Sequence, residues 1–490
     1  MHRSEYKHSR WGIMIVDAQS GQTIYAVSPD RLFIPASTTK LFSCATALTT
    51  LGPDYRFETP VFVRGVINKG ILEGDLILVA SGDLTMGGRN KEGKTLFENY
   101  DHTYANGGST PSTLTPTDPL YGLNQLAEQI SKKGIKEITG EILIDERLFP
   151  RFRSSGSGPE IVSSIMINDN LVDVTVIPAS KPNELARVEM RPKCDLIQMD
   201  AEVKTTEENQ PPKVIIQAMN STQFTIRGTI PVKHAPINRF FPIEEPSLFA
   251  RNLFIRCLRE KGILVHANAL RPSFFNLPPK GFYPKLNKIA SYESEPFRDV
   301  IKVTLKVSHN LYASTLPALV GLKKGDPTPT NGLRIQKQIL TDLGVDANAI
   351  SFGGGAGGTN SDLVSPREII HLLQGMAKRP EATIYFDSLP VMGLDGTLVD
   401  TVSASSPARG KVQAKTGTFI WFDLLNNRPM LRSKSIAGKM TTAKNRSLYF
   451  AIFLNDVAIE TGGSPARESK ALGEICELIY NLTPASPNSK

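Results

Sequence analysis

The chain of 490 residues has no uninterrupted apolar run of about 18 residues, so we expect no transmembrane helix. Its first ten residues, MHRSEYKHSR, lack the apolar core of a secretory signal. We therefore expect either that the protein is not exported or that the numbering begins after a removed leader. No cluster of lysine and arginine is long enough for a nucleic-acid-binding arm, and we expect no nucleic-acid partner. The net charge of +8 indicates a basic solvated surface or attraction to a polyanionic substrate.

Cysteine is also scarce, and the four residues Cys44, Cys194, Cys257 and Cys476 form no Cys-x-x-Cys pair. This spacing excludes a typical zinc site and a dense disulfide framework. All except Cys194 fall on the apolar stripe of a predicted helix, which favours buried small side chains. The seven histidines show no metal-ligand spacing. We expect no metal and no cofactor.

The pattern of predicted strands, helices and loops changes twice along the chain. With 40% hydrophobic and 21% charged residues, it is typical of a globular protein, and its length predicts two to four domains. Residues 58–289 consist mainly of short strand patterns separated by loops rich in glycine and proline, which predicts an insertion of one or two β-rich subdomains. Residues 1–57 and 290–490 supply strands and helices of another kind. These two segments predict one discontinuous α+β domain.

The first motif with chemical meaning is Ser37-Thr38-Thr39-Lys40, at the start of a helix predicted over residues 37–51. Positions i and i+3 share a helix face, so the Ser37 hydroxyl and the Lys40 amine can meet. A helix N-terminus favours negative charge, and a desolvated lysine can accept the serine proton. The same spacing recurs at Ser4 and Lys7, in a polar terminus without a helix pattern, so the motif alone does not decide the function.

Two further motifs follow in the chain. Ser308-His309-Asn310 comes at the end of a helix predicted over residues 296–307, where a hydroxyl can relay a proton and an amide can hold a substrate. Lys415-Thr416-Gly417, followed by Thr418, lies in a strand pattern over residues 410–419. There the polar side chains can bind a substrate carboxylate, and the glycine permits close approach. Alone, Ser308-His309-Asn310 is also typical of an ordinary helix end, and Lys415-Thr416-Gly417 is also typical of an exposed strand that ends in a glycine turn. Their order after Ser37 makes the set informative.

Together the three motifs resemble those of the class C penicillin-binding proteins, the D-alanyl-D-alanine carboxypeptidases and endopeptidases. Residues 389–398, LPVMGLDGTL, resemble family sequence as well. In this family large inserted domains separate the first two motifs, as the interval from Ser37 to Ser308 would require. The resemblance implies a β-lactamase/transpeptidase-like domain, an antiparallel sheet flanked by helices. It also implies peptidoglycan stem peptides as substrates, β-lactams as covalent inhibitors, and a periplasmic or otherwise extracytoplasmic location.

The resemblance further implies a role for each motif residue. Ser37 would attack the D-Ala–D-Ala carbonyl with Lys40 as the base for acylation. The backbone N–H groups of Ser37 and Thr418 would form the oxyanion hole. Ser308 and Lys415 would relay protons, and Asn310 would bind the substrate. Thr416 and Thr418 would bind its terminal carboxylate. The predicted site comprises the catalytic residues Ser37, Lys40, Ser308, Asn310 and Lys415 and the substrate-binding residues Thr416, Gly417 and Thr418.

The sequence departs from the family pattern in three places. Residues 352–356, FGGGA, replace the usual Asp-Gly-Ser-Gly-Leu; Ser314 stands where a glutamate is common; and an extra stretch containing Trp421 lengthens the segment after the third motif.

Two alternative functions stay open. The same serine site can serve a β-lactamase or esterase, although no separate base for activating water is evident. The altered glycine loop is compatible with a non-catalytic wall-binding protein. The sequence leaves the oligomeric state open.

Overall fold

The structure is a computed structural model that describes residues 4–107, 111–271, 277–460 and 463–481. The chain forms two compact units. The first comprises Met1–Asp54, Ser154–Gly156 and Phe297–Lys490, and the second comprises Tyr55–Arg153 and Ser157–Pro296. The sequence pattern placed its boundaries at 57/58 and 289/290, and it gave no sign that residues 154–156 belong with the first unit. Among the described residues, no helix has the length and apolar character needed to cross a bilayer.

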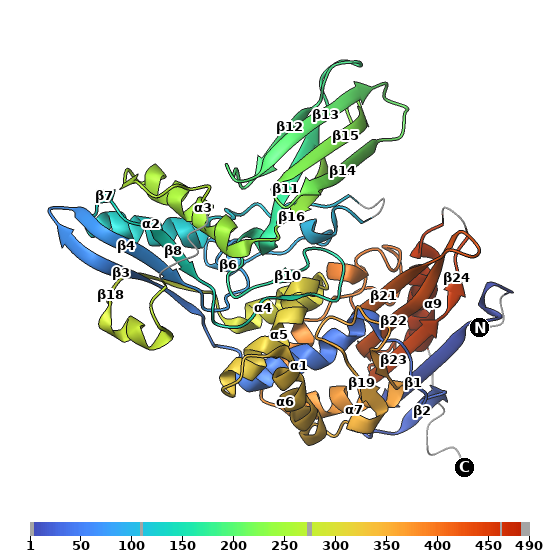
Figure 1. Cartoon of the computed structure of the whole chain (residues 1–490). Helices are drawn as coiled ribbons and strands as arrows, with labels where there is room; N and C mark the ends of the chain where they lie inside the picture. The colour runs from blue at the N-terminus through green and yellow to red at the C-terminus, as the bar shows by residue number, and fades with distance from the viewer. Residues whose placement is uncertain (1–3, 108–110, 272–276, 461–462, 482–490) are drawn as a thin grey trace, which may run out of the picture. The chain divides into compact units, whose positions relative to one another are not determined.

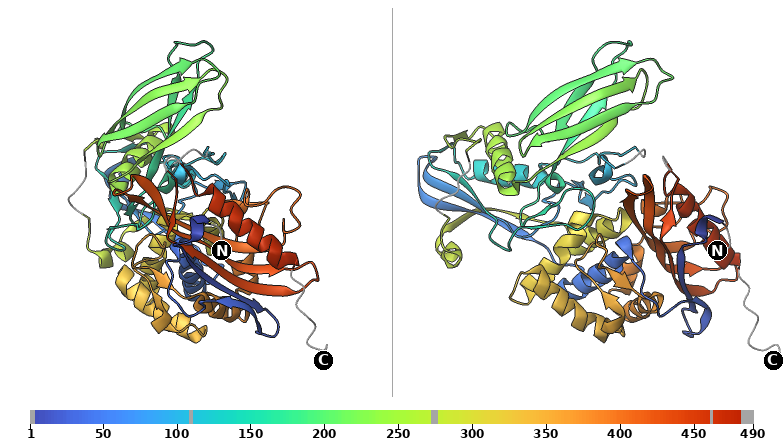
Figure 2. Two further views of the ribbon diagram at one scale, coloured as in Figure 1. Left: turned by 90° about the vertical axis from the view of Figure 1, so that its right-hand side faces the viewer. Right: turned by 45° about the vertical axis from the view of Figure 1, so that its right-hand side comes forward.

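The first unit is built on an antiparallel sheet in which the two ends of the chain meet. Strand β1 (Arg10–Asp17) pairs with β23 (Ser447–Asn455), so the blue N-terminal strands lie beside the red C-terminal strands in Figures 1 and 2. The order is β2-β1-β23-β22-β21, with β24 paired to β22. The other strands of this sheet are β2 (Thr23–Val27), β21 (Val412–Asp423), β22 (Arg428–Thr441) and β24 (Val457–Ala458).

Helices cover both faces of this sheet. Side chains alternate along a strand, so Ile13 and Ile15 of β1 join the core cluster that contains Leu472 and Cys476 of α9 (Ala466–Asn481), while the buried Met14 and Val16 point to the opposite face. The second helical layer lies on that opposite face (Figure 1). It contains η2 (Ala36–Thr39), α1 (Lys40–Leu51), α4 (Phe297–Lys306), α5 (Asn310–Lys323), α6 (Pro329–Asp342), α7 (Pro366–Ala377) and α8 (Ala382–Asp387), with the short strands β19 (Ile350–Ser351) and β20 (Leu363–Val364).

The second unit is rich in strands. Its largest sheet has the order β17-β7-β4-β3-β18, with β8 paired to β4, and the helices α2 and α3 pack on it. These elements are β3 (Glu58–Asn68), β4 (Ile71–Val79), β7 (Glu137–Ile138), β8 (Ile142–Asp145), β17 (Leu264–Val265), β18 (Asn287–Glu293), α2 (Tyr121–Lys132) and α3 (Pro246–Glu260).

Two three-stranded sheets complete this unit, with the orders β12-β11-β16 and β13-β15-β14. Their strands are β11 (Leu171–Ile177), β12 (Arg187–Arg191), β13 (Gln198–Thr206), β14 (Lys213–Asn220), β15 (Gln223–Pro231) and β16 (Ile237–Pro242). The shorter pairs are β5 (Asn90–Lys91) with β6 (Lys94–Thr95), and β9 (Phe152–Arg153) with β10 (Ile161–Val162). An α+β fold with a large β-rich insertion is therefore confirmed.

A buried group of charges lies inside the second unit. Arg89 contacts Asp101 at 2.8 Å and Asp169 at 2.6 Å, and His102 lies 2.8 Å from Asp169 and 2.7 Å from Asp173. Burial alone would lower the pKa of His102, but the Asp173 and Asp169 carboxylates outweigh it and raise this pKa to about 10. His102 is therefore a permanently charged partner of these acids near neutral pH.

The four cysteines are buried and free. The sequence predicts burial for three of them, Cys44, Cys257 and Cys476, and leaves the disulfide state open. Cys44, Cys257 and Cys476 lie on α1, α3 and α9. Burial raises the pKa of the Cys44 thiol to about 12, so this residue stays a neutral packing group although it lies one helical turn from Lys40.

Candidate active site

Ser37 lies on a turn that aims its hydroxyl at Lys40. The predicted helix begins differently from the expectation, because residues 36–39 form the 3-10 turn η2 and the α-helix starts at Lys40. Ala36, the residue before Ser37, has φ +48°, a left-handed conformation that costs energy for a residue with a Cβ. Such strain persists where the surroundings impose it and is common at functional sites. The Lys40 Nζ lies 2.8 Å from the Ser37 Oγ.

Lys40 is completely buried and held by three acceptors. Its Nζ donates to the Ser37 Oγ, to the Asn310 Oδ1 at 2.6 Å and to the Ala356 carbonyl at 2.8 Å. Burial lowers the pKa of Lys40 to about 7, although Cys44 and Asp362 act in the opposite direction. About half of the molecules therefore carry a neutral Lys40 near pH 7, which is the state that can take a proton from a serine.

A second lysine–serine pair faces the first. The Lys415 Nζ donates to the Ser308 Oγ at 2.8 Å and to the Thr416 carbonyl at 2.7 Å. Ser308 follows α4 with φ +63°, so its backbone also adopts the left-handed conformation. Burial, together with the nearby Lys40 and Lys434, holds the pKa of Lys415 well below its usual value. Two buried lysines thus lie beside two hydroxyls, as a proton relay requires.

The Lys-Thr-Gly motif occupies the edge strand β21, where Gly417 packs against the turn that carries Ser37. A Cβ on Gly417 would lie 2.3 Å from the Ser435 Oγ, 2.5 Å from the Pro35 carbonyl and 3.0 Å from the Ser37 nitrogen. Only glycine lets the strand approach this closely. The Ser435 Oγ donates to the Pro35 carbonyl at 2.8 Å and fastens β22 to the same turn. Thr418, the next residue, is exposed.

Asn310 begins α5 and is packed against the segment 154–156. A Cβ on Gly156 would lie 2.2 Å from the Asn310 Cγ, so this glycine permits a close contact with the amide. Ser314, which replaces a glutamate common in the resembling family, shares a hydrogen bond of 2.9 Å with Ser154. A neutral, hydrogen-bonded hydroxyl therefore stands where the family commonly has a carboxylate.

Three polar residues that the sequence analysis missed also lie here. The Asp362 carboxylate accepts from the Gly353 N–H at 2.8 Å and the Thr359 N–H at 3.0 Å, and it acts on Lys40 through space. It thus supplies an acid to the glycine loop, although the family's aspartate is absent. Thr416 donates to Thr397 at 2.7 Å. Lys434 donates to the Thr418 Oγ1 at 2.8 Å. The missed residues are Asp362, Thr397 and Lys434.

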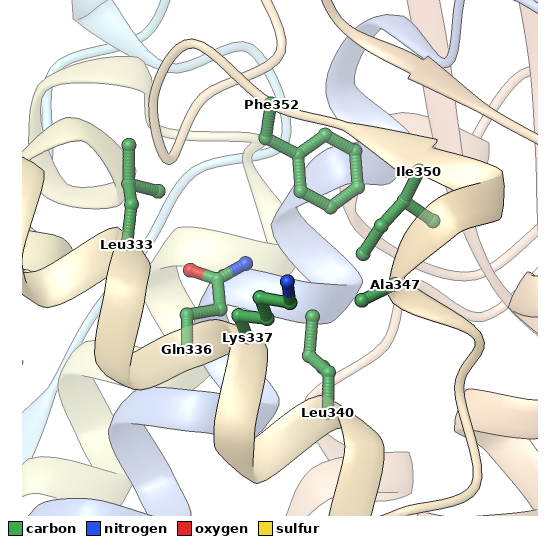
Figure 3. Close-up of a pocket in the computed structure, with 7 residues that line it drawn as sticks. All are labelled: Leu333, Gln336, Lys337, Leu340, Ala347, Ile350 and Phe352. Atoms are coloured by element: carbon green, nitrogen blue, oxygen red, sulfur yellow. The ribbon is translucent and has the colours of Figure 1, made fainter.

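A cavity of about 150 Å³ lies elsewhere in the same unit, between α6 and the following segment (Figure 3). Its wall is mainly apolar, and Phe352 packs on Phe42 of α1 with ring centroids 5.0 Å apart. The lining residues are Leu333, Gln336, Lys337, Leu340, Ala347, Ile350 and Phe352. None of the predicted catalytic residues lines it.

The structure brings all eight predicted residues to one region, where η2, the α4–α5 junction and β21 meet. Its chemical content is a hydroxyl with a base, a second hydroxyl with a second base, an amide, and an edge strand able to pair with an extended peptide. This set is suited to acyl transfer through a serine ester.

Comparison with known proteins places this geometry in a family. The model of the D-Ala-D-Ala carboxypeptidase 3 (S13) family matches residues 2–473. The chain is 24% identical to the D-alanyl-D-alanine carboxypeptidase DacB of Haemophilus influenzae over 96% of its own length and 91% of that protein. It is 23% identical to the D-alanyl-D-alanine carboxypeptidase of Actinomadura sp. (strain R39), over 83% of this chain and 72% of that one.

The fold is also found among solved structures. Penicillin-binding protein 4 (dacB) from Haemophilus influenzae superposes with a TM-score of 0.71 at 21% identity, covering 97% of each chain. A second structure of that protein, in complex with a β-lactam, superposes with a TM-score of 0.68 and the same coverage. These likenesses confirm the transpeptidase-like fold that the motifs predicted.

Proposed function

Because the chain belongs to the D-Ala-D-Ala carboxypeptidase 3 (S13) family, a family of serine-type carboxypeptidases, we propose that Ser37 is the nucleophile of this enzyme. The observation that carries the proposal is the 2.8 Å hydrogen bond between the Ser37 Oγ and a fully buried Lys40 whose pKa is lowered to about 7. A serine is a weak nucleophile unless a neighbouring base takes its proton, and neutral Lys40 is that base.

The reaction has two steps. In the first, the Ser37 proton passes to Lys40, and the Oγ attacks the carbonyl carbon between two D-alanine residues. The negative charge on the carbonyl oxygen is received by the backbone N–H groups of Ser37 and Thr418; losing one such donor typically costs about 3 kcal/mol of transition-state stabilisation. The C–N bond breaks, the leaving amine takes a proton through Ser308 and Lys415, and an ester on Ser37 remains.

In the second step, water attacks the ester, the bond between its carbonyl carbon and the Ser37 Oγ breaks, and the serine recovers its proton. Asn310 holds the amide of the substrate in both steps, which keeps the carbonyl within reach of Ser37. The hydroxyls of Thr416 and Thr418 receive the carboxylate on the leaving-group side. A β-lactam is attacked in the same way, and its opened ring stays attached to Ser37 as a slowly hydrolysed ester.

The substrates are peptidoglycan stem peptides, and both cleavage of a terminal D-alanine and cleavage of a cross-link are compatible with this site. Because such peptides lie outside the cytoplasm, we place the enzyme in the periplasm or another extracytoplasmic space. Of the alternatives, a β-lactamase would require fast hydrolysis of the Ser37 ester, and a binding protein would require an inactive serine.

The test is release of D-alanine from Nα,Nε-diacetyl-L-Lys-D-Ala-D-Ala by purified protein. Wild type should release it, and both Ser37→Ala and Lys40→Met should lose at least about a thousandfold in kcat/KM, since both belong to one proton-transfer unit. Release of D-alanine by Ser37→Ala at the wild-type rate would refute the assignment. Rapid turnover of a chromogenic β-lactam without any D-alanine release would identify the site as a β-lactamase instead.

A further inference from the structure

Lys434 lies on β22, the strand that pairs with the strand carrying the Lys-Thr-Gly motif. It lies opposite Thr418 of β21, in the register that also pairs Gly417 with Ser435. Its Nζ donates to the Thr418 Oγ1 at 2.8 Å. Lys434 is buried, with 7% of its surface exposed, whereas Thr418 is exposed. The hydroxyl of Thr418 therefore stands between a buried ammonium group and solvent.

This ammonium group has no close counter-charge. In the part of the chain that the structure describes, Lys434 forms no ion pair, and Glu468 of α9 acts on it only through space. Burial lowers the pKa of Lys434 to about 8, so most molecules carry the charge near pH 7. A buried cation without an anion is costly. An anion bound at Thr418 would supply the missing charge.

Lys434 differs in its hydrogen-bond partner from Lys40 and Lys415, the two buried lysines of the predicted site. Lys40 and Lys415 each donate to a serine of the proposed proton relay, at 2.8 Å in both cases. Lys434 contacts neither serine. Its hydrogen bond goes instead to Thr418, which the proposed function assigns to the carboxylate on the leaving-group side.

The two threonines of the motif are also unequal. Thr416 donates its hydroxyl proton to Thr397 and must break this bond before it donates to a carboxylate. Thr418 accepts from Lys434, which leaves its own hydroxyl proton available to a ligand. A hydroxyl that accepts from a cation becomes a better donor, because the two hydrogen bonds polarise each other. Charge-assisted bonds of this kind are roughly twice as strong as neutral ones.

We propose that Lys434 is a positioning residue that determines specificity for a carboxylate on the leaving group, which it recognises through the chain Lys434 Nζ–H···Oγ1–H of Thr418. This inference rests on the proposed function and deepens it. The enzyme then selects peptides whose leaving amino acid carries a free carboxylate next to the scissile amide. Peptides in which that carboxyl is amidated are discriminated against.

The experiment compares the peptide Nα,Nε-diacetyl-L-Lys-D-Ala-D-Ala with its C-terminal amide. Lys434→Met removes the charge and keeps the chain length, and it should lower kcat/KM for the acid by about 10- to 100-fold, the usual effect of losing a charged hydrogen bond. The amide should change by no more than about twofold. Lys434→Arg, which keeps a cation, should recover part of the preference for the acid. Lys439→Met, which removes a charge from the same strand outside the site, should leave both substrates unchanged.

Two results would overturn the inference. An equal loss of kcat/KM on acid and amide would mean that Lys434 only supports the strand. Wild-type kcat/KM on both substrates would mean that it plays no part in recognition. A double-mutant cycle adds a stricter condition. In a Thr418→Val background, Lys434→Met should alter the acid-to-amide ratio no further, because the lysine acts through that hydroxyl.

Failure of the proposed function gives a different pattern. If wild type releases no D-alanine from either peptide, the carboxypeptidase assignment fails. Lys434 is then still tested by the rates at which benzylpenicillin and its methyl ester acylate the protein. Lys434→Met should lower the acid-to-ester ratio of these rates by about tenfold or more. An unchanged ratio in that assay would overturn the inference on its own.

Discussion

Replacement of Lys40 by methionine should remove the free-energy penalty of burying an amine that must lose its proton in the folded protein. This penalty is measured as a pH-dependent difference in the free energy of unfolding. The pKa of Lys40 is 10.5 in an unconstrained chain and about 7 in the fold, because the amine is buried. At pH values between these two pKa values, the unfolded state binds more protons than the folded state, so the free energy of unfolding rises with pH. The stability that the protein loses by burying Lys40 is greatest below pH 7, and this loss disappears as the pH approaches 10.5.

The magnitude follows from the two pKa values. At about 1.4 kcal/mol per pKa unit, the penalty is about 5 kcal/mol at pH 6 and about 2 kcal/mol at pH 9. Methionine also leaves the acceptors of Lys40 without their donor, which costs stability, but this cost does not vary with pH over the same range. The stability of Lys40→Met relative to wild type should therefore fall by about 2 to 3 kcal/mol between pH 6 and pH 9.

Urea unfolding followed by tryptophan fluorescence is a suitable assay. The chain has two tryptophans, Trp11 and Trp421, and both belong to the first unit, so the signal reports the unit that contains Lys40. Lys411→Met, which removes an exposed charge directly before β21, is the matched control, and its stability difference from wild type should be constant between pH 6 and pH 9. A Lys40→Met difference that is equally independent of pH would refute the account of Lys40 as a desolvated base.

Three further outcomes follow from the same geometry. The kcat/KM for D-alanine release should rise with pH through about 7, because Lys40 must lose its proton before it accepts one; a rate independent of pH between about 5 and 8 would contradict this. Asp362→Asn removes a charge that raises the pKa of Lys40, so the midpoint of that rise should move to lower pH, and an upward shift would contradict the geometry. Gly417→Ala should reduce benzylpenicillin acylation by at least about a hundredfold, since its Cβ would lie 2.5 Å from the Pro35 carbonyl, whereas Gly281→Ala, with no atom within 4 Å, should behave as wild type.

The proximity of the motif residues could be predicted because each motif is local in sequence and fits its element. Ser37 and Lys40 are three residues apart, and the turn that joins them brings them within 2.8 Å whether it is a 3-10 or an α-helical turn. The discontinuity of the first unit could also be predicted, because the two terminal segments share a pattern of strands and helices that the middle segment lacks. The assignment of catalytic roles stays a prediction that the experiments above address.

Lys434 and Asp362 could not be predicted, because their importance depends on contacts between distant segments. Lys434 reaches Thr418 only through the antiparallel register of β21 and β22, and a shift of one residue would point it to the other face of the sheet. Asp362 lies beyond the altered glycine loop and returns to accept the Gly353 N–H. The loop itself carries no acid, whereas the fold supplies one from nine residues downstream.

The most direct test of the account is the identity of the serine acylated by a fluorescent penicillin. Trypsin releases residues 32–40, LFIPASTTK, a peptide in which Ser37 is the only serine. The adduct should appear on this peptide in wild type and in Ser4→Ala, the variant of the other Ser-x-x-Lys match, and should be absent from Ser37→Ala. An adduct on Ser308 or any other residue, or no adduct on the wild-type protein, would contradict the assignment of Ser37 as the nucleophile.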